Sequence, residues 1–497
     1  MAETKERIIM FPFTAQGHII PFLALALHIE KKTRGSYAMT FVNPTKNIMN
    51  LKSSLPPSSS IHLLEIPFDS SSHGQLPPGA ENCDALPYHL VPHLLQASAS
   101  LKPVFKELIT EQIKVDNGRR PLCIIGDIFF GWTASVAREL GIFHVVFSGA
   151  GAFGLACYYS LWTNLPRLKF AGDDEFTLPD FQEASKIRRT QLPLSMVEAD
   201  GTDSWSVFQN SNLPEWVNSD GILFNSPEEF DRIGTLYFKR KLGLSVWSIG
   251  PICLPEQSRP RAGKEDGIVS PELCKKWLDQ KPVKSVLYIL FGSINTISAA
   301  QMSQLAMALE FSGKNFIWVV RPPTGFDINS DFNAEKWLPE GFSERMSESG
   351  RGLLVQKWAP QVEILSHPSV SAFLSHCGWN SVIESLSRGV PLLGWPMAGE
   401  QFFNVKFLME ELGVCVEVAR GNTCEVKQED IAEKIKVVMD EREKGKDTRR
   451  KAEKMKETIM AATKNEDGWR GSSVKAMDAF LEAALTRKVV ENGLQFN

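Results

Sequence analysis

The segment 371–389 carries the residues whose types and spacing point most directly to chemistry. It reads Ser-Ala-Phe-Leu-Ser-His-Cys-Gly-Trp-Asn-Ser-Val-Ile-Glu-Ser-Leu-Ser-Arg-Gly, which predicts a buried strand, a tight turn at Gly378 and a helix that opens at Asn380 and Ser381. A helix N-terminus presents unpaired N–H groups and the positive end of the helix dipole, and a glycine lets the backbone approach a ligand closely. The pattern therefore predicts an anion site, most naturally for phosphate, where His376 supplies a further donor.

Glu384 extends this site toward a second ligand group. It lies one turn beyond Asn380 on the same helix face, within reach of a sugar hydroxyl next to the phosphate. A structural alternative exists, because Ser381 followed by Glu384 is also the pattern of a capping box, which needs no ligand. Trp379 favours the ligand, since a large aromatic side chain in a turn between core elements usually covers something.

Three other predicted strands end in polar or aromatic residues. Trp358-Ala-Pro-Gln361, Phe291-Gly-Ser293 and Pro396-Met-Ala-Gly-Glu400-Gln401 each follow or close a short apolar run. Ligands of open α/β sheets bind beyond the carboxyl ends of the strands, where such loops meet. The indole of Trp358 can stack on a planar base there, although a lone tryptophan can also serve packing. The convergence of four such loops predicts a ligand site more strongly than any one of them.

A separate pair of residues in the first half of the chain can transfer a proton. His18 follows the first predicted strand and its turn, and Asp127 ends another strand of the same predicted sheet. A neutral imidazole accepts a proton from a hydroxyl near physiological pH, and a carboxylate at its far nitrogen orients the ring and stabilises the imidazolium. Taken in isolation, His18 is one of nine histidines, and a histidine is more often an ordinary surface or core residue than a catalytic base.

Apolar runs that alternate with helical patterns indicate the elements that position these residues. The predicted strands are 7–13, 39–42, 61–66, 121–125 and 143–147 in the first half and 286–291, 316–320, 353–357, 370–374, 390–393 and 414–418 in the second. This alternation predicts two similar α/β halves with parallel sheets covered on both faces. The polar segment 254–267 is the predicted linker, and the chain from 428 to about 484 is predicted to be helical.

Composition and charge exclude several classes of protein. The 497 residues carry 54 Lys+Arg against 58 Asp+Glu with no basic tract, so a nucleic acid is not an expected partner. The eight cysteines form no CxxC pair and several lie in apolar runs, which is typical of reduced thiols. No secretory signal is expected. Glycines and His144 break the uncharged stretch 141–166, so we expect a soluble protein without stable membrane insertion.

The stretch from Trp358 to Gln401 closely resembles the donor-binding box of plant UDP-dependent glycosyltransferases. It contains WAPQ, HCGWNS, a glutamate ahead of GVP and a final acidic-Gln pair. The resemblance extends through most of the chain, with FPFTAQGHIIP at the start, WLDQKP before the strand at 286, FGS at 291–293 and WVVRPP at 318–323. It implies the α/β fold called GT-B, in which two facing Rossmann-like domains with parallel sheets enclose an interdomain cleft.

The resemblance also implies the domain organisation. We expect an acceptor-binding domain over residues 1–252, a linker over 253–270, a UDP-sugar-binding domain over 271–465 and a C-terminal helix over 466–497 that crosses back onto the first domain. Loops around 83–93, 148–162 and 185–210 would build the acceptor pocket. Its predicted residues are Phe129, Phe153 and Trp205, which with Phe130 suggest a flat or polycyclic apolar molecule.

Single residues receive roles from the same resemblance. Trp358 would stack on uracil and the Ala359 backbone would pair with its edge, while Gln361 and Glu384 would hold the ribose hydroxyls. The residues expected at the diphosphate are Ser293, His376, Gly378, Asn380 and Ser381, and those expected at the transferred sugar are Trp379, Glu400 and Gln401. His18 would be the general base with Asp127 as its partner, because QGH and GD-x-F match those positions of the family.

The activity implied is an inverting transfer of glucose from UDP-glucose to a hydroxyl of an apolar small molecule, such as a flavonoid, another phenolic or a terpenoid. His18 would deprotonate the acceptor hydroxyl, which attacks the anomeric carbon as UDP leaves. The chain contains no Asp-x-Asp sequence, so we expect a metal-independent enzyme without a cofactor, acting as a monomer in the cytoplasm. Which acceptor and which hydroxyl are used stays open.

Two alternatives remain. Gly149-Ala-Gly-Ala-Phe-Gly154 matches G-x-G-x-x-G after a strand and before a helix, with Asp173, Asp174 and Glu175 about 20 residues further on, as in an NAD(P)-dependent oxidoreductase. Those acids fall in a polar loop without the second strand that a dinucleotide-binding βαβ unit requires. Gly149 also departs from the family, where a Thr or Ser often contacts the sugar. The second alternative is a catalytically inactive nucleotide-sugar-binding protein, against which the intact catalytic pair argues.

Overall fold

The chain folds into two compact units in a computed structural model, which describes residues 5–494 except 57, 84–85, 166–174, 255–269, 441 and 467. Unit 1 holds the described residues of 5–187, 195–254 and 462–494, and unit 2 holds 188–194 and those of 270–461. Most of the predicted linker, 253–270, lies outside the described residues. The domain boundaries expected from the sequence therefore stay a prediction.

Unit 1 is built on a seven-stranded sheet in the order β3-β2-β1-β4-β5-β8-β9, with parallel pairings throughout. Its strands are β1 (Glu6–Phe11), β2 (Tyr37–Asn43), β3 (His62–Glu65), β4 (Cys123–Asp127), β5 (Phe143–Ser148), β8 (Gly221–Phe224) and β9 (Ser245–Ser248). Side chains along β1 alternate between two cores, with Ile8 and Met10 in one and Ile9 and Phe11 in the other. The sheet is therefore buried on both faces, as is usual for parallel sheets.

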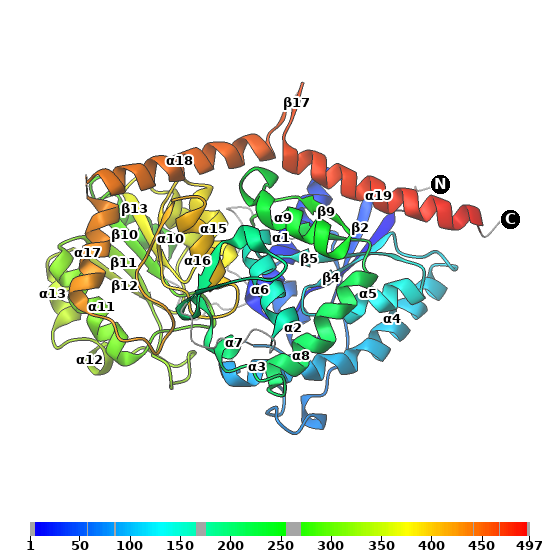
Figure 1. Cartoon of the computed structure of the whole chain (residues 1–497), viewed down its shortest axis with the longest axis horizontal. Helices are drawn as coiled ribbons and strands as arrows, with labels where there is room; N and C mark the ends of the chain where they lie inside the picture. The colour runs from blue at the N-terminus through cyan, green and yellow to red at the C-terminus, as the bar shows by residue number, and fades with distance from the viewer. Residues whose placement is uncertain are drawn as a thin grey trace. The chain divides into compact units, whose positions relative to one another are not determined.

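Helices cover both faces of this sheet. They are α1 (Gln16–Lys32), α2 (Thr45–Ser54), α3 (Val91–Ala97), α4 (Leu101–Val115), α5 (Trp132–Glu139), α6 (Ala152–Asn164), α8 (Ser204–Asn212), α9 (Glu228–Leu242) and α19 (Ser472–Leu494). One core joins the sheet to α1, α2 and α19, and the other joins it to α3, α4 and α5. Figure 1 shows α19 in red and the pair α4 and α5 in cyan on opposite sides of the strands.

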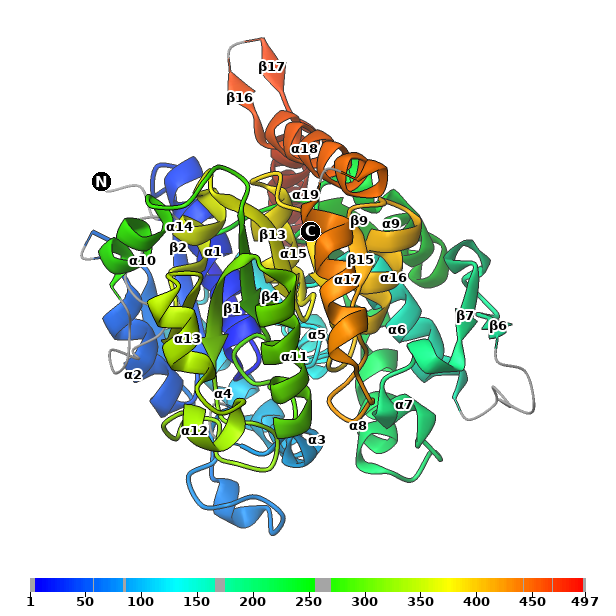
Figure 2. The ribbon, with the colours of Figure 1, turned by 90° about the vertical axis from the view of Figure 1, so that its left-hand side faces the viewer.

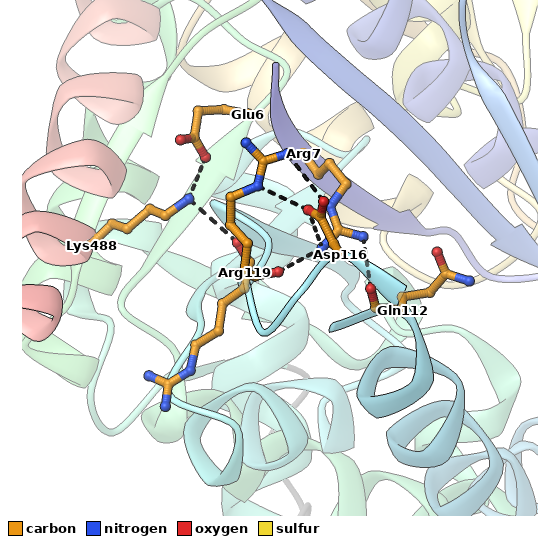
Figure 3. Close-up of polar contacts among 7 residues, drawn as sticks. Glu6, Arg7, Gln112, Asp116, Arg119 and Lys488 are labelled. Carbon is orange, nitrogen blue, oxygen red and sulfur yellow. Dashed lines mark hydrogen bonds and ion pairs between the residues drawn. The ribbon is translucent and has the colours of Figure 1, made fainter. Parts of the chain in front are cut away.

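Polar contacts fasten the start of β1 to the end of α4 (Figure 3). The guanidinium of Arg7 donates to the carbonyl of Arg119 at 2.7 Å and lies 3.1 Å from the carboxylate of Asp116. It also donates to the carbonyl of Gln112 at 3.4 Å, within the last turn of α4. One arginine side chain thus ties the first strand of the sheet to a helix more than 100 residues away in sequence.

The C-terminal helix α19 packs on the same unit. Lys488 forms an ion pair with Glu6 and donates to the carbonyl of Arg120 at 3.3 Å (Figure 3). Phe480, on the apolar face of α19, packs against β9: its ring lies 5.8 Å from the ring of Trp247. Apolar contacts and an ion pair therefore act together to hold α19 against the sheet.

Unit 2 repeats the same plan with a six-stranded parallel sheet in the order β12-β11-β10-β13-β14-β15. Its strands are β10 (Val286–Leu290), β11 (Asn315–Val320), β12 (Gly352–Gln356), β13 (Val370–Ser375), β14 (Leu392–Gly394) and β15 (Cys415–Glu417). All six strands predicted from the sequence of this half are confirmed within about two residues at each end.

Helices of unit 2 surround this sheet. They are α10 (Pro271–Leu278), α11 (Ala299–Ser312), α12 (Ala334–Trp337), α13 (Phe342–Glu348), α14 (Gln361–Ser366), α15 (Trp379–Leu386), α16 (Gln401–Glu410), α17 (Gln428–Met439) and α18 (Glu443–Thr463). Figure 2 shows α11 and α17 side by side, and their apolar residues form one core with β10, β11 and β13.

Several short elements complete the described part of the chain. They include short 3₁₀ helices, α7 (Leu194–Val197), the paired strands β6 (Glu175–Thr177) and β7 (Lys186–Arg188), and the hairpin of β16 (Asn465–Glu466) and β17 (Trp469–Arg470) between α18 and α19. The part of the uncharged stretch that the structure describes, 141–165, contains the strand β5 and the helix α6, as predicted. Within the described ranges, the structure contains no helix with the length and hydropathy that a membrane span requires.

Each sheet has one point at which its winding reverses. In unit 1 the chain runs outward through β1, β2 and β3 and then returns to place β4 beside β1. In unit 2 it runs through β10, β11 and β12 and then places β13 beside β10. Loops at the carboxyl ends of such a strand pair diverge and leave space for a ligand. His18 and Asp127 lie at the first of these points, and Gly292, Ser293 and the start of α15 lie at the second.

Candidate active site

The reversal point of unit 1 brings His18 and Asp127 together. His18 lies in the first turn of α1, and Asp127 is the last residue of β4. The Nδ1 atom of His18 lies 3.0 Å from Oδ2 and 3.2 Å from Oδ1 of Asp127. Because carboxylate oxygens only accept, Nδ1 carries the proton in the neutral ring, and Nε2 holds the lone pair that can take a proton from a hydroxyl. The carboxylate is 1% exposed, whereas the imidazole keeps 25% of its surface exposed.

Buried side chains support the strand that carries Asp127. Gly126 leaves room for two of them, since a Cβ at this position would lie 2.2 Å from Oγ1 of Thr133 and 2.9 Å from Nε2 of His144. Thr133 and His144 contact each other at 3.0 Å. Burial lowers the pKa of His144 to about 3, so this imidazole is neutral at physiological pH. A side chain at position 126 would displace these groups from behind β4.

Aromatic side chains surround the imidazole of His18. The ring of Phe129, a predicted acceptor residue, lies 5.1 Å from the imidazole, and its backbone N–H donates to Asp127 at 3.0 Å. Phe13 meets the imidazole edge-on at 5.3 Å. Trp205, also predicted, is half-buried at the margin of the adjoining apolar core. The sequence prediction placed Phe13 at the end of the first strand and gave it no role at the site, whereas β1 ends at Phe11 and Phe13 lies in the loop before α1.

The acceptor role expected of Phe153 is not supported by its position. Phe153 is 1% exposed, and its ring packs on Phe181 at 5.6 Å inside unit 1. The backbone N–H groups of Ala152 and Phe153 donate to the two oxygens of buried Asp231, at 2.5 and 2.8 Å. The N–H groups that a dinucleotide phosphate would need at the start of α6 are therefore already bonded to a carboxylate. This geometry argues against the oxidoreductase alternative.

Gly149 has a packing reason to be glycine. A Cβ at this position would lie 2.9 Å from Cγ of Pro21, in the helix that carries His18. A threonine or serine here would need a shift of the backbone or of the Pro21 ring. Asp173 and Asp174 lie outside the described residues, and Glu175 is an exposed residue of β6.

In unit 2, the N-terminus of α15 lies at the reversal point, where the anion site was predicted. The N-cap residue is Gly378, which has no side chain to cap the helix. Ser381 is the third residue of the helix and not its N-cap, so Ser381 and Glu384 do not form the capping box weighed from the sequence. The neighbouring α11 begins with a genuine capping box, in which Ser298 and Gln301 each bond to the backbone of the other. Of these two helix starts, only that of α15 has a glycine in place of a capping side chain.

His376 lies between two glycines at this point. Its Nε2 would lie 2.5 Å from a Cβ on Gly378 and 2.7 Å from a Cβ on Gly292, so neither position admits a side chain without a shift. Burial lowers the pKa of His376 to about 4, so the ring is neutral at physiological pH. Its Nδ1 is buried and has no hydrogen-bond partner within the described part of the chain. A neutral ring can bond to an anion but cannot neutralise its charge.

A buried pair of polar side chains joins α14 to α15. The amide Nε2 of Gln361 donates to Oε2 of Glu384 at 2.6 Å and lies 3.3 Å from Oγ of Ser381. Trp358, predicted to stack on a base, is half-buried in the loop just before α14, and Ala359 is 2% exposed. The structure therefore brings both predicted ribose ligands into contact, beside the loop that carries the predicted stacking residue.

Arg321 was not predicted as a site residue, yet it connects two of the strand-end loops. It directly follows β11, and its guanidinium donates to the carbonyl of Ser293 and, at 2.8 Å, to the carbonyl of Lys357. Ser293 is exposed, as a ligand-contacting hydroxyl must be. An arginine immediately after a predicted strand, at the edge where ligands bind, was the signal that could have found it.

Residues expected at the sugar occupy the start of α16 and of α15. The Oε1 of Gln401 accepts from the N–H groups of Met397 and Ala398 at 3.0 and 3.1 Å, which leaves its Nε2 as the group that can donate to a sugar. Glu400 is the half-buried N-cap of α16. The side chain of Trp379, expected at the sugar, is 3% exposed. In the described ranges, no three His, Cys, Asp or Glu side chains gather as a metal site would require.

Comparisons with known proteins agree with these features. Residues 270–451 match the family described as UDP-glucoronosyl and UDP-glucosyl transferase. The chain is 51% identical to UDP-glycosyltransferase 92A1 of Arabidopsis thaliana over 497 residues, which cover 98% of this chain and 100% of that protein. It is 42% identical to crocetin glucosyltransferase 3 of Crocus sativus over 460 residues, which cover 89% of this chain and 92% of that protein.

Solved structures show the same fold. UGT73P12 of Glycyrrhiza uralensis, complexed with glycyrrhetinic acid 3-O-monoglucuronide, matches with a TM-score of 0.83 and 28% identity over 99% of this chain and 98% of that chain. UGT2 of Phytolacca americana, complexed with UDP-2fluoro-glucose and pterostilbene, matches with a TM-score of 0.77 and 26% identity over 96% and 99%. The predicted GT-B fold is confirmed, and the chain belongs to the plant family of UDP-dependent glycosyltransferases.

Proposed function

We propose that this protein is an inverting glucosyltransferase that moves glucose from UDP-glucose to a hydroxyl of an apolar small molecule, with His18 as general base and Asp127 as its partner. The observation that carries the proposal is the contact of His18 Nδ1 with both oxygens of the buried Asp127. This contact keeps Nε2 as an acceptor on a ring that is a quarter exposed. A positioned base of this kind accelerates a reaction by about 10²- to 10⁴-fold.

The chemistry is a single displacement. His18 Nε2 takes the proton of the acceptor hydroxyl, the hydroxyl oxygen bonds to the anomeric carbon, and the bond from that carbon to UDP breaks. Attack opposite the leaving group inverts the configuration from α to β. The carboxylate of Asp127 stabilises the imidazolium that forms, and backbone N–H groups at the start of α15 stabilise the charge that develops on the departing diphosphate.

The donor is proposed to bind to the strand-end loops of unit 2. Trp358 stacks on uracil with the Ala359 backbone at its edge, and the bonded pair Gln361 and Glu384 holds the ribose hydroxyls. The diphosphate contacts are Ser293, His376, Gly378, Asn380 and Ser381, and the sugar contacts are Trp379 through its backbone, Glu400 and Gln401. Glucose is supported by relatives named glucosyltransferases and by the UDP-2fluoro-glucose bound in the Phytolacca americana protein.

The acceptor is proposed to be an aromatic or polycyclic apolar alcohol. Phe13 and Phe129 flank the imidazole with apolar rings, which favour a flat apolar molecule beside the reacting hydroxyl. Relatives are named for crocetin, for scopoletin and for an anthocyanin, and pterostilbene is bound in the Phytolacca americana structure. These molecules share an extended conjugated skeleton, and we infer the same class of acceptor here.

The direct test is product formation. The purified protein is incubated with UDP-glucose and a panel of phenolic and terpenoid aglycones and their glycosides, with mass spectrometry and proton NMR as readouts. We expect the addition of one hexose in β configuration and release of one UDP for each product. An α-linked product would refute the inverting mechanism. Absorbance change at 340 nm with a nicotinamide cofactor and no UDP release would favour an oxidoreductase instead.

Charge stabilisation by backbone N–H groups predicts that divalent cations are dispensable. Activity in excess EDTA is expected to stay within about twofold of the untreated enzyme, because the N-terminus of α15 and not a cation stabilises the leaving diphosphate. The measurement is the initial rate of UDP release before and after chelation, with added Mg²⁺ as the control. Loss of most activity in EDTA that Mg²⁺ restores would contradict this prediction.

A cytoplasmic location is the remaining part of the proposal. All eight cysteines are free thiols, and six of them are buried, which suits a reducing compartment. A fluorescent fusion expressed in plant cells is expected to fill the cytoplasm. Retention in the endoplasmic reticulum or the vacuole would contradict the assignment.

A further inference from the structure

Asn404 on α16 is a buried polar residue to which no role has been assigned. Its side chain is 0% exposed, and its Nδ2 donates to the backbone carbonyl of Cys377 at 3.0 Å. Its Oδ1 has no hydrogen-bond partner among the residues that the structure describes. A buried amide with a hydrogen bond to only one of its two polar atoms lowers the stability of the fold. The bond that Asn404 does make is therefore expected to serve a function.

The bond partner Cys377 has an unusual backbone. Its φ is +58°, in the left-handed region that non-glycine residues rarely adopt. Its N–H donates to Oγ of Ser375 at 3.1 Å, and its carbonyl accepts from Asn404. Both polar groups of this strained residue are therefore held by side chains, one from the end of β13 and one from α16.

The carbonyl of Cys377 and the N–H of Gly378 belong to the same peptide group. In a trans peptide these two groups point in opposite directions within one plane. A bond that holds the carbonyl toward Asn404 therefore turns the Gly378 N–H away from Asn404. Gly378 is the N-cap of α15, so the orientation of its N–H is part of the anion-binding geometry at the start of that helix.

The same device occurs at a second strand-end loop of this sheet. Lys357, directly before Trp358, also has a positive φ of +66°. Its carbonyl accepts from the guanidinium of Arg321 at 2.8 Å. Two loops that carry proposed donor ligands thus each contain one left-handed residue whose carbonyl is held by a side chain from a neighbouring element.

We propose that Asn404 is a positioning residue for the diphosphate of the donor, because it holds the Cys377–Gly378 peptide with its N–H directed to the diphosphate. The proposal rests on the proposed function, in which the diphosphate binds at the start of α15. Asn404 touches no substrate. Its loss lets this peptide rotate, so the affinity for ligands that carry a diphosphate falls, while the affinity for the nucleoside part, held by Trp358, Gln361 and Glu384, is retained.

The test compares UDP with uridine by isothermal titration calorimetry on the full chain. For Asn404→Ala, we expect the Kd for UDP to rise about tenfold, the loss of one hydrogen bond, and the Kd for uridine to change less than twofold. Asn404→Thr is the second variant, since threonine has a similar volume and its hydroxyl bonds within its own helix, so the packing is kept while the amide donor is lost. It is expected to show the same selective loss.

The matched control is Ser385→Ala. Ser385 lies in α15, is 0% exposed and donates to a backbone carbonyl, that of Val390, at 2.8 Å, away from the start of the helix. This variant is expected to leave the affinities for both UDP and uridine within twofold of the wild type. A parallel loss of UDP and uridine affinity in both Asn404 variants, or no loss of either, would overturn the proposal. A wild-type protein that binds UDP no tighter than uridine would instead refute the diphosphate site itself.

Discussion

The two sheets of this protein have the same winding but opposite chemistry at their reversal points. Between β1 and β4 of unit 1, the loops supply two side chains that bond to each other, His18 and Asp127. Between β10 and β13 of unit 2, the loops supply Gly292 and Gly378, whose lack of a Cβ leaves room for the ring of His376. The first arrangement suits proton transfer, and the second suits binding of an anion.

Side-chain volume separates the two points. In unit 1, Phe13 and Phe129 pack against the imidazole, which keeps 25% of its surface exposed. In unit 2, His376 fits only because both neighbouring positions are glycine. The common topology therefore offers a position for a site, and the size of a few loop residues decides whether side chains or backbone N–H groups act there.

Helix starts show the same contrast at a smaller scale. The N-terminal N–H groups of α6 are bonded by Asp231, and those of α11 are capped by Ser298, but α15 begins at a glycine. A helix dipole alone does not make an anion site when a carboxylate or hydroxyl of the protein already occupies it. This comparison explains why the G-x-G-x-x-G sequence at 149–154 does not mark a nucleotide site.

The largest effect is expected for the side chains of unit 1. His18→Ala removes the proposed base and is expected to lower turnover about 10³-fold, with the Kd for UDP within twofold of the wild type. Turnover is measured by UDP release and affinity by calorimetry. Asp127→Asn keeps the shape of the side chain, but its amide can donate to Nδ1 and leave the proton on Nε2, so a similar loss of about 10³-fold is expected. Full activity of His18→Ala would show that His18 is not the general base.

The polar pair of unit 2 is expected to affect binding instead. Glu384→Ala should raise the Kd for uridine and for UDP about 30-fold each, because it removes a charged acceptor and releases Gln361. Glu363→Ala on the exposed surface of α14 is the matched control and should change neither affinity. If Glu384→Ala binds uridine and UDP as tightly as the wild type does, the ribose site is assigned wrongly.

The buried imidazole of His144, behind β4, predicts that the stability of the protein depends on pH. Its folded pKa is about 3 against about 6.5 when unfolded, so between these values the unfolded chain binds a proton that folded His144 does not. The free energy of unfolding should therefore fall by about 1.4 kcal/mol per pH unit as pH drops through this window. His144→Gln, followed by urea unfolding at several pH values, should show a shallower slope. An unchanged slope would contradict the prediction.

The smallest effect is expected at the capped helix of unit 2. Ser298→Ala should lower the free energy of unfolding by about 1 kcal/mol through loss of the cap and leave the affinity for UDP unchanged. Ser347→Ala, at an exposed helical position, serves as the control for substitution of a surface serine. A marked loss of UDP affinity in Ser298→Ala would show that the two helix starts do not have separate roles.

Strands bounded by polar residues were predicted well, and strands without that contrast were missed. β11 matches the predicted run because its residues 316–320 are a continuous apolar stretch with Asn315 before it and Arg321 after it. β8 follows an irregular segment and is only four residues long, and β9 begins and ends with serine. A short strand is stabilised by its neighbours in the sheet, so its own pattern carries little information.

Ordered motifs were sufficient to place the chain in its family and to identify the proposed pair His18 and Asp127, since both depend on residue types at given spacings. The burial of Phe153 and Trp379 followed from neighbours that no spacing reveals. The bond from Asp231 to Ala152 spans 79 residues, and that from Asn404 to Cys377 spans 27. Such contacts arise only when strands and helices pack in three dimensions, because packing decides which N–H and carbonyl groups meet a side chain and which are left for a ligand.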